Sequence, residues 1–328
     1  MRGVLETAGE RLAIECAVPW VADLIEEGAA GELRSSGSPG WGSLRVLVEP
    51  DRRPFDTAGW QVITRGAWRS GTDIVVANAC TAGFDVHVRC TPEDAEFTFR
   101  WRPPPRDRAA SRILRSRFHL LARAVLMQYP PLWWAQVRGR APLHASACVG
   151  GDTTPLVSSA SGVGRSTLLF AEIAAGARTT DDNLAVSDGT TVWGLVEPIR
   201  LEGAGGRRMP HGRSEAALPG RVDAVVPDSV IVVERGLAER SSLSPCSSEA
   251  AAYSLVTNTY MAGELRRYWA FAAILSAGTG YGPAHPPIAD VAAALTAALP
   301  CYSLALGATP GDKRVSELLS SREVGAWA

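Results

Sequence analysis

Residues 156–169, with the sequence LVSSASGVGRSTLL, determine how the fold is interpreted. The first residues predict a short buried strand, the small residues a turn, and the remainder a helix beginning near Arg165. This order is typical of a phosphate-binding loop, G-x-x-x-x-G-K-[ST], in which backbone N–H groups and a helix N-terminus face a polyphosphate. Ser159 takes the place of the first glycine, and Arg165 takes the place of the lysine.

The small residues of this loop suit an anion. Ser161, Gly162 and Gly164 leave room for backbone N–H groups to curl around a phosphate. Ser166 is placed to offer a hydroxyl to Mg²⁺. Arg165 keeps a positive charge, but its planar guanidinium differs from the compact ammonium of a lysine. An unrelated Gly/Ser turn between a strand and a helix is the alternative interpretation.

Length and composition indicate a globular protein with more than one core. The chain has 328 residues, of which 46% are hydrophobic and 20% charged, enough for two domains. A formal net charge of -1 argues against a nucleic-acid partner. We expect no signal peptide, because the first residues lack a basic segment followed by an apolar one. No apolar run reaches the roughly 18 residues that span a bilayer. We therefore expect a cytoplasmic protein without membrane contact.

Residues 1–105 predict a β-rich N-terminal domain. Short alternating runs bounded by Gly, Pro, Asp or Asn suit a small antiparallel sheet, with one helix near 22–27; the runs are 11–18, 44–48, 60–64, 73–77, 84–89 and 96–101. His87 alternates with valines, which indicates a sheet-face histidine. The proline-rich residues 102–106 predict the domain boundary.

Residues 106–140 predict a linker helix and a connection. The helix is expected over about 108–128, with apolar residues at a 3.6-residue period and arginines opposite, and Pro130-Pro131 ends it. The arginines form a solvated face or a contact for an acidic partner; they are Arg108, Arg112, Arg115, Arg117 and Arg123.

Residues 141–328 predict an α/β domain. Strands are expected at 143–149, 154–158, 230–234 and 301–306, with a hairpin formed by 184–186 and 191–193. Helices are expected at 167–175, 248–257, 262–276 and 288–298. A Gly- and Arg-rich segment between 202 and 220 predicts a mobile loop. Within this segment or just before it, Arg200, Arg207, Arg208 or Arg213 is a candidate phosphate clamp or a solvated charge.

The cysteines and the lysine content also constrain the interpretation. Six cysteines lack the spacing of a zinc site, and buried free thiols are expected. Lys313 is the only lysine, a bias typical of a high-GC genome. Replacement of a loop lysine by Arg165 is consistent with that bias.

Asp181-Asp182 follows the loop by about fifteen residues, after the next predicted strand. Carboxylates at that strand end would lie beside bound phosphates. One could bind Mg²⁺, and the other could accept a proton from an attacking hydroxyl. A plain turn is the alternative.

These motifs together resemble the C-terminal domain of HPr kinase/phosphorylase and its relatives. The resemblance rests on His144 in LHASA (143–147), on the loop, and on GARTTDDN (176–183), and it is dense from about 141 to 200. It implies an α/β fold with an α+β N-terminal part, in which a P-loop domain resembling phosphoenolpyruvate carboxykinase follows the β-rich domain. It also implies transfer of the γ-phosphate of ATP to a hydroxyl.

The resemblance assigns roles residue by residue. ATP would contact the loop, which comprises Ser161, Gly162, Val163, Gly164, Arg165, Ser166 and Thr167. Mg²⁺ would contact Ser166 and Asp182. Asp181 would be the base, with His144 and Arg165 beside the transferred phosphate.

Three functions follow from these expectations. The first is an ATP- and Mg²⁺-dependent kinase acting on a hydroxyl of a peptide or small molecule, in a biosynthetic setting and with the homo-oligomeric assembly that the family often shows. The second is a catalytically inactive nucleotide sensor or a scaffold for a peptide or partner. The third is a transferase that uses another phosphorylated donor in the same pocket.

Overall fold

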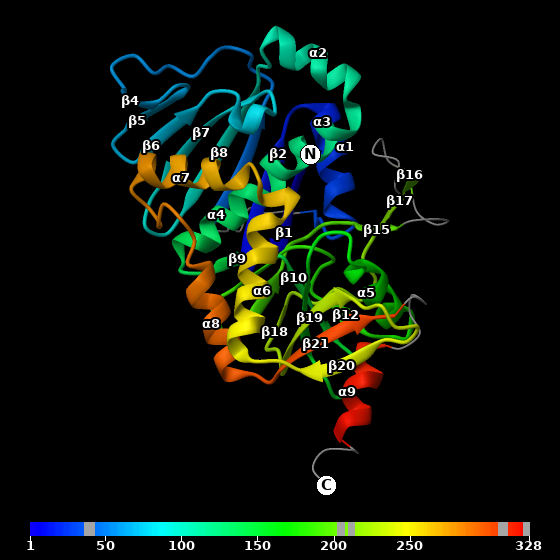
Figure 1. Ribbon diagram of the computed structural model, residues 1–328. Coiled ribbons are helices and arrows are strands. Elements are labelled where there is room, and N and C mark those ends of the chain that lie inside the picture. Colours follow the sequence, from blue (N-terminus) through cyan, green and yellow to red (C-terminus); the bar gives the residue numbers. More distant parts are fainter. Residues whose placement is uncertain (36–42, 202–206, 209–213, 308–313, 324–328) are drawn as a thin grey trace. The chain divides into compact units, whose positions relative to one another are not determined.

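The structure, a computed structural model, describes residues 1–35, 43–201, 207–208, 214–307 and 314–323. The fold is mixed α/β (Figure 1). The chain divides into two compact units. Unit 1 comprises Met1–Gly139, Val196–Ala217 and Arg267–Pro286, and unit 2 comprises Arg140–Leu195, Leu218–Arg266 and Pro287–Ala328. This division differs from the predicted ranges 1–105, 106–140 and 141–328, because two later segments of the chain return to unit 1.

Unit 1 contains an eight-stranded sheet in the order β1-β2-β3-β8-β7-β6-β5-β4. Its strands are β1 (Arg2–Thr7), β2 (Glu10–Cys16), β3 (Leu44–Glu49), β4 (Gln61–Thr64), β5 (Ala67–Ser70), β6 (Asp73–Val76), β7 (Phe84–Cys90) and β8 (Ala95–Trp101). The prediction of a small antiparallel sheet is wrong, because β3 pairs in parallel with both β2 and β8. Helix α1 (Pro19–Ala29) lies between β2 and β3 and provides the crossover that a parallel pair needs.

The predicted helix over 108–128 is divided and longer than expected. The structure has α2 (Pro105–Ile113), α3 (Arg115–Arg123), a π-helical turn η2 (Ala124–Gln128) and α4 (Tyr129–Val137). Pro130-Pro131 therefore does not end the helical segment. The two prolines lie in the first turn of α4, where the missing N–H groups cost little.

The core of unit 1 lies between the sheet and its helices. Phe97 and Trp133 are fully buried and meet edge to face, with ring centroids 5.8 Å apart. Helix α7 (Tyr268–Thr279) packs on β5 and β6, where Gly278 leaves space for Ile74. A 3-10 turn η1 (Ala79–Thr81) and a small sheet complete this unit; the sheet comprises β15 (Ile199–Leu201), β16 (Arg207–Arg208) and β17 (Ser214–Ala216).

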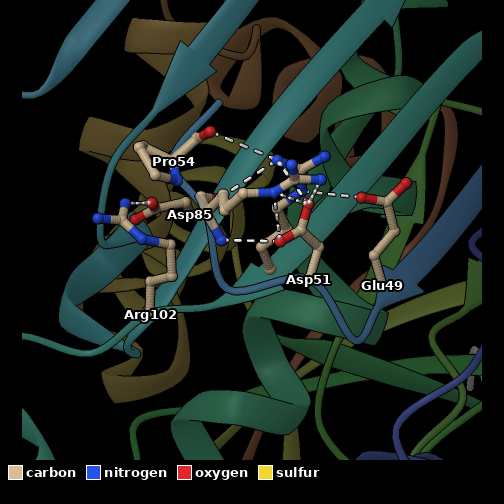
Figure 2. A network of polar contacts seen from close by, with 7 residues as sticks. Glu49, Asp51, Pro54, Asp85 and Arg102 are labelled. Carbon is tan, nitrogen blue, oxygen red and sulfur yellow. Dashed lines mark hydrogen bonds and ion pairs between the residues drawn. The ribbon is translucent and has the colours of Figure 1, made fainter. Parts of the chain in front are cut away.

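A polar network covers the opposite face of the same sheet (Figure 2). Arg100 Nε donates to Glu49 Oε2 at 2.8 Å, and its guanidinium lies 4.1 Å from the ring centre of Phe55. Arg102 pairs with Asp85 nearby. His87 belongs to this face and lies 3.2 Å from Asp73 Oδ2, so its prediction as a sheet-face histidine is confirmed.

Unit 2 contains a six-stranded sheet in the order β12-β10-β11-β19-β21-β20 and a four-stranded sheet in the order β18-β14-β13-β9. The larger sheet comprises β10 (Ala145–Val149), β11 (Pro155–Ser159), β12 (Arg178–Thr179), β19 (Ser229–Arg235), β20 (Ser242–Pro245) and β21 (Cys301–Leu306). The smaller comprises β9 (Ala141–Leu143), β13 (Ala185–Ser187), β14 (Val192–Gly194) and β18 (Ala224–Val225). Strands β11, β19 and β21 are parallel, so their carboxyl ends meet at one edge.

The helices of unit 2 are α5 (Arg165–Ala174), α6 (Ser248–Met261), α8 (Ile288–Ala298) and α9 (Val315–Glu323), with a 3-10 turn η3 (Gly263–Leu265) (Figure 1). The predicted strand–turn–helix and the hairpin around Asp188-Gly189 are confirmed. The helix predicted at 262–276 is wrong at its start, where η3 and then α7 replace it.

Within the segment predicted as a mobile loop, residues 214–216 pair both with β15 and with residues 207–208. Residues 202–206 and 209–213 lie outside the described residues. All six cysteines are free thiols, and four of them are buried; Cys80 and Cys246 are half-buried. Within the described parts of the chain, no helix combines the length and apolar character needed to cross a bilayer.

Gly194 generates a test of the packing in unit 2. A Cβ added to Gly194 would lie 2.0 Å from the backbone oxygen of Thr180, so β14 or the chain just after β12 must move to accommodate it. We expect Gly194→Ala to lower the free energy of unfolding by about 1–3 kcal/mol, the usual cost of overpacking, as measured by urea denaturation. Gly263→Ala is the matched control, because nothing lies within 4 Å of its added Cβ. Equal stability of the two variants would contradict this packing.

Candidate functional site

The predicted phosphate loop lies between β11 and α5 and is accessible. Ser161 and Gly162 are exposed, whereas Val163, Gly164 and Ser166 are half-buried and Thr167 is exposed. Gly162 has φ 80° and Gly164 has φ 124°, conformations that favour glycine. Ser159 is buried in β11 and needs no positive φ, so its place in the motif requires no glycine. The turn leaves the first backbone N–H groups of α5 at the loop.

The side chain of Arg165 does not lie at the surface of the loop. It is buried in the interior of unit 2. It is only 5% exposed. Its Nη1 donates to His144 O at 2.8 Å, and its Nη2 donates to Asn183 O at 3.1 Å and to Asn183 Oδ1 at 2.9 Å. The planar guanidinium thus joins α5 to the β9–β10 junction and to the residues after β12. A lysine ammonium could not make these divergent bonds at once.

Asp181 interacts electrostatically with this cation and is fully buried. Ser146 Oγ donates to its Oδ1 at 2.9 Å, and Thr180 Oγ1 donates to its Oδ2 at 2.7 Å. Burial raises the pKa of Asp181 to about 7, against the opposing effect of the two hydroxyls and of Arg165. Both carboxylate oxygens are therefore occupied within the protein.

Asp182 differs from its neighbour, although it is also buried at 4% exposure. Its Oδ1 has no hydrogen-bond partner among the described residues. Asn183 Nδ2 is likewise buried without a partner in the described part of the chain. Buried polar atoms in native proteins are nearly always paired, so these two atoms mark a place where water or a ligand belongs.

His144 lies at the break between β9 and β10 and is 3% exposed. Its backbone N–H donates to Thr259 Oγ1 at 3.0 Å. Its ring Nε2 lies 2.9 Å from Asn183 Oδ1 and 3.0 Å from Arg165 Nη2. Burial, together with the charge of Arg165, lowers the pKa of His144 to about 4. The imidazole is therefore neutral at physiological pH.

The structure thus brings together four of the predicted site residues, His144, Arg165, Asp181 and Asp182, in one cluster of unit 2. Of the candidate clamp arginines, only Arg200 has a described side chain. Arg200 belongs to unit 1 and pairs with Glu197 and Glu215. Arg213 and the side chains of Arg207 and Arg208 lie outside what the structure describes.

Several residues of the site were not predicted from the sequence. Ser146 and Thr180 bind the Asp181 carboxylate, and Asn258 Nδ2 donates to Ser158 Oγ at 3.2 Å. Arg235 is exposed, and its Nη2 donates to Gly162 O at 3.0 Å. One signal was available for Arg235: it ends the strand parallel to β11, and the carboxyl ends of parallel strands meet at the loop edge.

Comparison with protein-family models and with curated proteins finds no match to this chain.

The Arg165 geometry predicts a stability difference between arginine and lysine. Arg165→Lys removes at least one charged hydrogen bond to a buried acceptor, worth about 1.5–3 kcal/mol. We expect a corresponding loss in the free energy of unfolding, measured with urea. Arg235→Lys is the control, because Arg235 is exposed and its side chain donates to a backbone oxygen, that of Gly162, at the surface. An Arg165→Lys variant as stable as the wild type would contradict the buried placement.

The two perturbed groups predict opposite effects of pH on stability. Asp181 has a folded pKa of about 7, above the ordinary value of 3.8, so its contribution to stability is lost as pH rises from about 4 to 7. His144 has a folded pKa of about 4, below the ordinary 6.5, so its contribution is lost as pH falls through the same range. The two slopes therefore oppose each other.

Substitution should separate these slopes. Asp181→Asn leaves the His144 effect, so its free energy of unfolding should rise with pH relative to the wild type over this range. His144→Gln should fall with pH relative to the wild type. Urea titrations at successive pH values measure how the free energy of unfolding of each protein changes with pH. A pH-independent loss of stability caused by the substitution does not affect this slope. Parallel profiles for all three proteins would show that neither group is perturbed.

Proposed function

We propose that the protein is a nucleotide-dependent phosphotransferase that transfers a phosphoryl group to a hydroxyl of a peptide or small molecule. One observation carries this proposal. The guanidinium of Arg165, at the start of α5, links the phosphate-type loop to His144 and to the segment Asp182-Asn183. This link supports the assignment of the loop, the acidic pair and the histidine of the HPr kinase resemblance to one site.

The loop suits the phosphates of ATP. A Cβ at Gly162 would meet nothing within 4 Å, so the backbone there is open to a ligand. The N-terminus of a ten-residue helix favours an anion, and Arg235 adds an exposed positive charge at Gly162. ATP, when bound, would supply the phosphoryl group, and Mg²⁺ would offset its negative charge.

Asp182 and Ser166 are the residues that would hold Mg²⁺. The partnerless Oδ1 of Asp182 is an acceptor that a cation would satisfy, and Ser166 lies half-buried in the first turn of α5. Among the described residues, no group of three or more metal-ligating side chains occurs. This donor set fits Mg²⁺, which commonly takes one or two protein ligands together with water and phosphate oxygens.

Asp181 is the residue we assign as base. A carboxyl group with a pKa of about 7 is well matched to proton transfer at neutral pH. Its Oδ1 already accepts a hydrogen bond from one hydroxyl, that of Ser146, as it would from a substrate hydroxyl. Arg165 and the neutral His144 hold the segment that carries it.

A nucleotide sensor without phosphotransferase activity is the second candidate, and the burial of Asp181 favours it. The carboxylate has no exposed surface, and both of its oxygens are bonded internally. In such a protein, the loop would bind the nucleotide while the acidic pair served only to hold β12 and the β13–β14 hairpin in place.

Nucleotide binding is the measurement that tests the shared part of both candidates. We expect calorimetry with ATP and Mg²⁺ to give binding that Gly162→Ala weakens at least about tenfold, because an L residue is strained at this positive φ and the loop must change shape. Gly176→Ala is the matched control: it has φ 93° and equally open surroundings, but it lies at the other end of α5. Absence of ATP binding to the wild type, or equal weakening by both variants, would contradict the proposal.

Turnover separates the two candidates. For the phosphotransferase, slow ATP hydrolysis by the purified protein should be lost in Asp181→Asn while ATP binding is retained. Binding without any turnover, unaltered by Asp181→Asn, would assign the protein to the sensor class.

A further inference from the structure

Helix α2 of unit 1 is unusual because none of its residues is buried. It follows β8 and stands apart from the sheet (Figure 1). Asn78 Nδ2 donates to Asp107 Oδ2 at 2.6 Å and ties its first turn to the unit. The backbone then bends at Leu114, with φ -101° and ψ 51°, and α3 begins. Isolated helices of this length are marginal in water, and core packing supplies nothing here.

The charges on α2 further destabilise the helix in the absence of a partner. Arg108 and Arg112 are four residues apart on one face and repel each other. Both are exposed, as are Arg115 and Arg117 at the start of α3. None of these four guanidinium groups forms an ion pair with the part of the chain that the structure describes. Asp107 is the only acidic residue between 105 and 118, and it already contacts Asn78.

Two apolar side chains lie among these arginines. Ile113 is 80% exposed and Leu114 is 47% exposed. They lie at the bend, where the chain passes from the arginines of α2 to those of α3, so two exposed apolar residues are flanked in the chain by exposed cationic ones. An interface commonly combines a small apolar centre with a polar rim.

We propose that this arginine surface, formed by Arg108, Arg112, Ile113, Leu114, Arg115 and Arg117, is a docking site for an acidic peptide segment that carries a bulky apolar residue. Carboxylates of the segment pair with the guanidinium groups, whose planar forks match carboxylate geometry. The apolar residue covers Ile113 and Leu114. Binding relieves the like-charge repulsion of Arg108 and Arg112 and gives α2 the packing that it lacks in the chain alone.

The composition of the surface favours an acidic peptide over an anionic membrane or a nucleic acid. A membrane-bound helix presents a continuous apolar face, whereas α2 contributes Ile113 alone besides two alanines. Single-stranded nucleic acid is usually bound through aromatic side chains that stack on bases, and α2 carries none. Carboxylate pairing with one apolar contact accounts for every exposed side chain of the surface.

Fluorescence anisotropy of the full-length protein tests this docking site. The probe is a fluorescein-labelled peptide of glutamates that flank a pair of leucines. We expect saturable binding that weakens as salt is added, because exposed charges are screened. The double variant Arg108→Glu/Arg112→Glu should weaken binding at least about tenfold, and Ile113→Asp should weaken it as well. Arg52→Glu/Arg65→Glu, which reverses the same charge at exposed sites of unit 1, is the matched control and should bind like the wild type.

Three outcomes would overturn the proposal. The first is absence of peptide binding to the wild type at low salt. The second is equal loss in the two double variants, which would mean that net charge alone attracts the probe. The third is binding to phosphatidylglycerol vesicles or to single-stranded RNA that depends on Arg108 and Arg112 while the peptide does not bind. Circular dichroism of each variant, compared with the wild type, verifies that the fold is retained. The ATP-binding loop belongs to unit 2, so failure here leaves the phosphotransferase proposal unaffected.

Discussion

The buried guanidinium of Arg165 is the interaction on which the site in unit 2 depends. A cation without solvent must be matched by acceptors, or its desolvation is not offset. The acceptors come from two separate segments of the chain. They are the backbone oxygens of His144 and Asn183 and the side-chain oxygen of Asn183. Because these groups belong to different segments, the cation fixes the distance between β11–α5, the β9–β10 junction and the chain after β12. Burial, together with this cation, lowers the pKa of His144, and the cation partly offsets the effect of burial on the pKa of Asp181.

This placement changes where the loop obtains its positive charge. In a phosphate loop with lysine, the ammonium lies over the bound phosphates. Here the corresponding side chain is directed inward, so an anion at the loop would be met by backbone N–H groups, by the helix dipole and by Arg235. An arginine with this placement is therefore not equivalent to the lysine of the motif. The backbone of Arg165 belongs to the end of the loop, whereas its side chain binds acceptors in the interior of the unit.

Local patterns were predictable from the sequence, and long-range pairings were not. The strand, turn and helix of the loop and the hairpin around Asp188-Gly189 depend on neighbours in the chain, so composition and spacing indicated them. The parallel pairing of β3 depends on partners far away in the sequence. So does the destination of the Arg165 side chain, which could not be inferred without knowing that His144 and Asn183 converge on it. Pro130-Pro131 does not end the helical segment for a related reason: the π-helical turn η2 precedes the prolines, so they fall in the first turn of α4, where proline is tolerated.

The close approach of Gly194 to Thr180 has a consequence for the dynamics of Asp181. Asp181 is fully buried, and the main chain of β14 closely approaches Thr180, the residue just before it. We therefore expect Asp181 to become exposed only when the β13–β14 hairpin and the segment that carries Asp181 move. Collective motions of that kind occur over microseconds to milliseconds, not over the nanoseconds of a rotamer change. The rate at which this carboxylate becomes exposed thus depends on the stability of the β13–β14 hairpin.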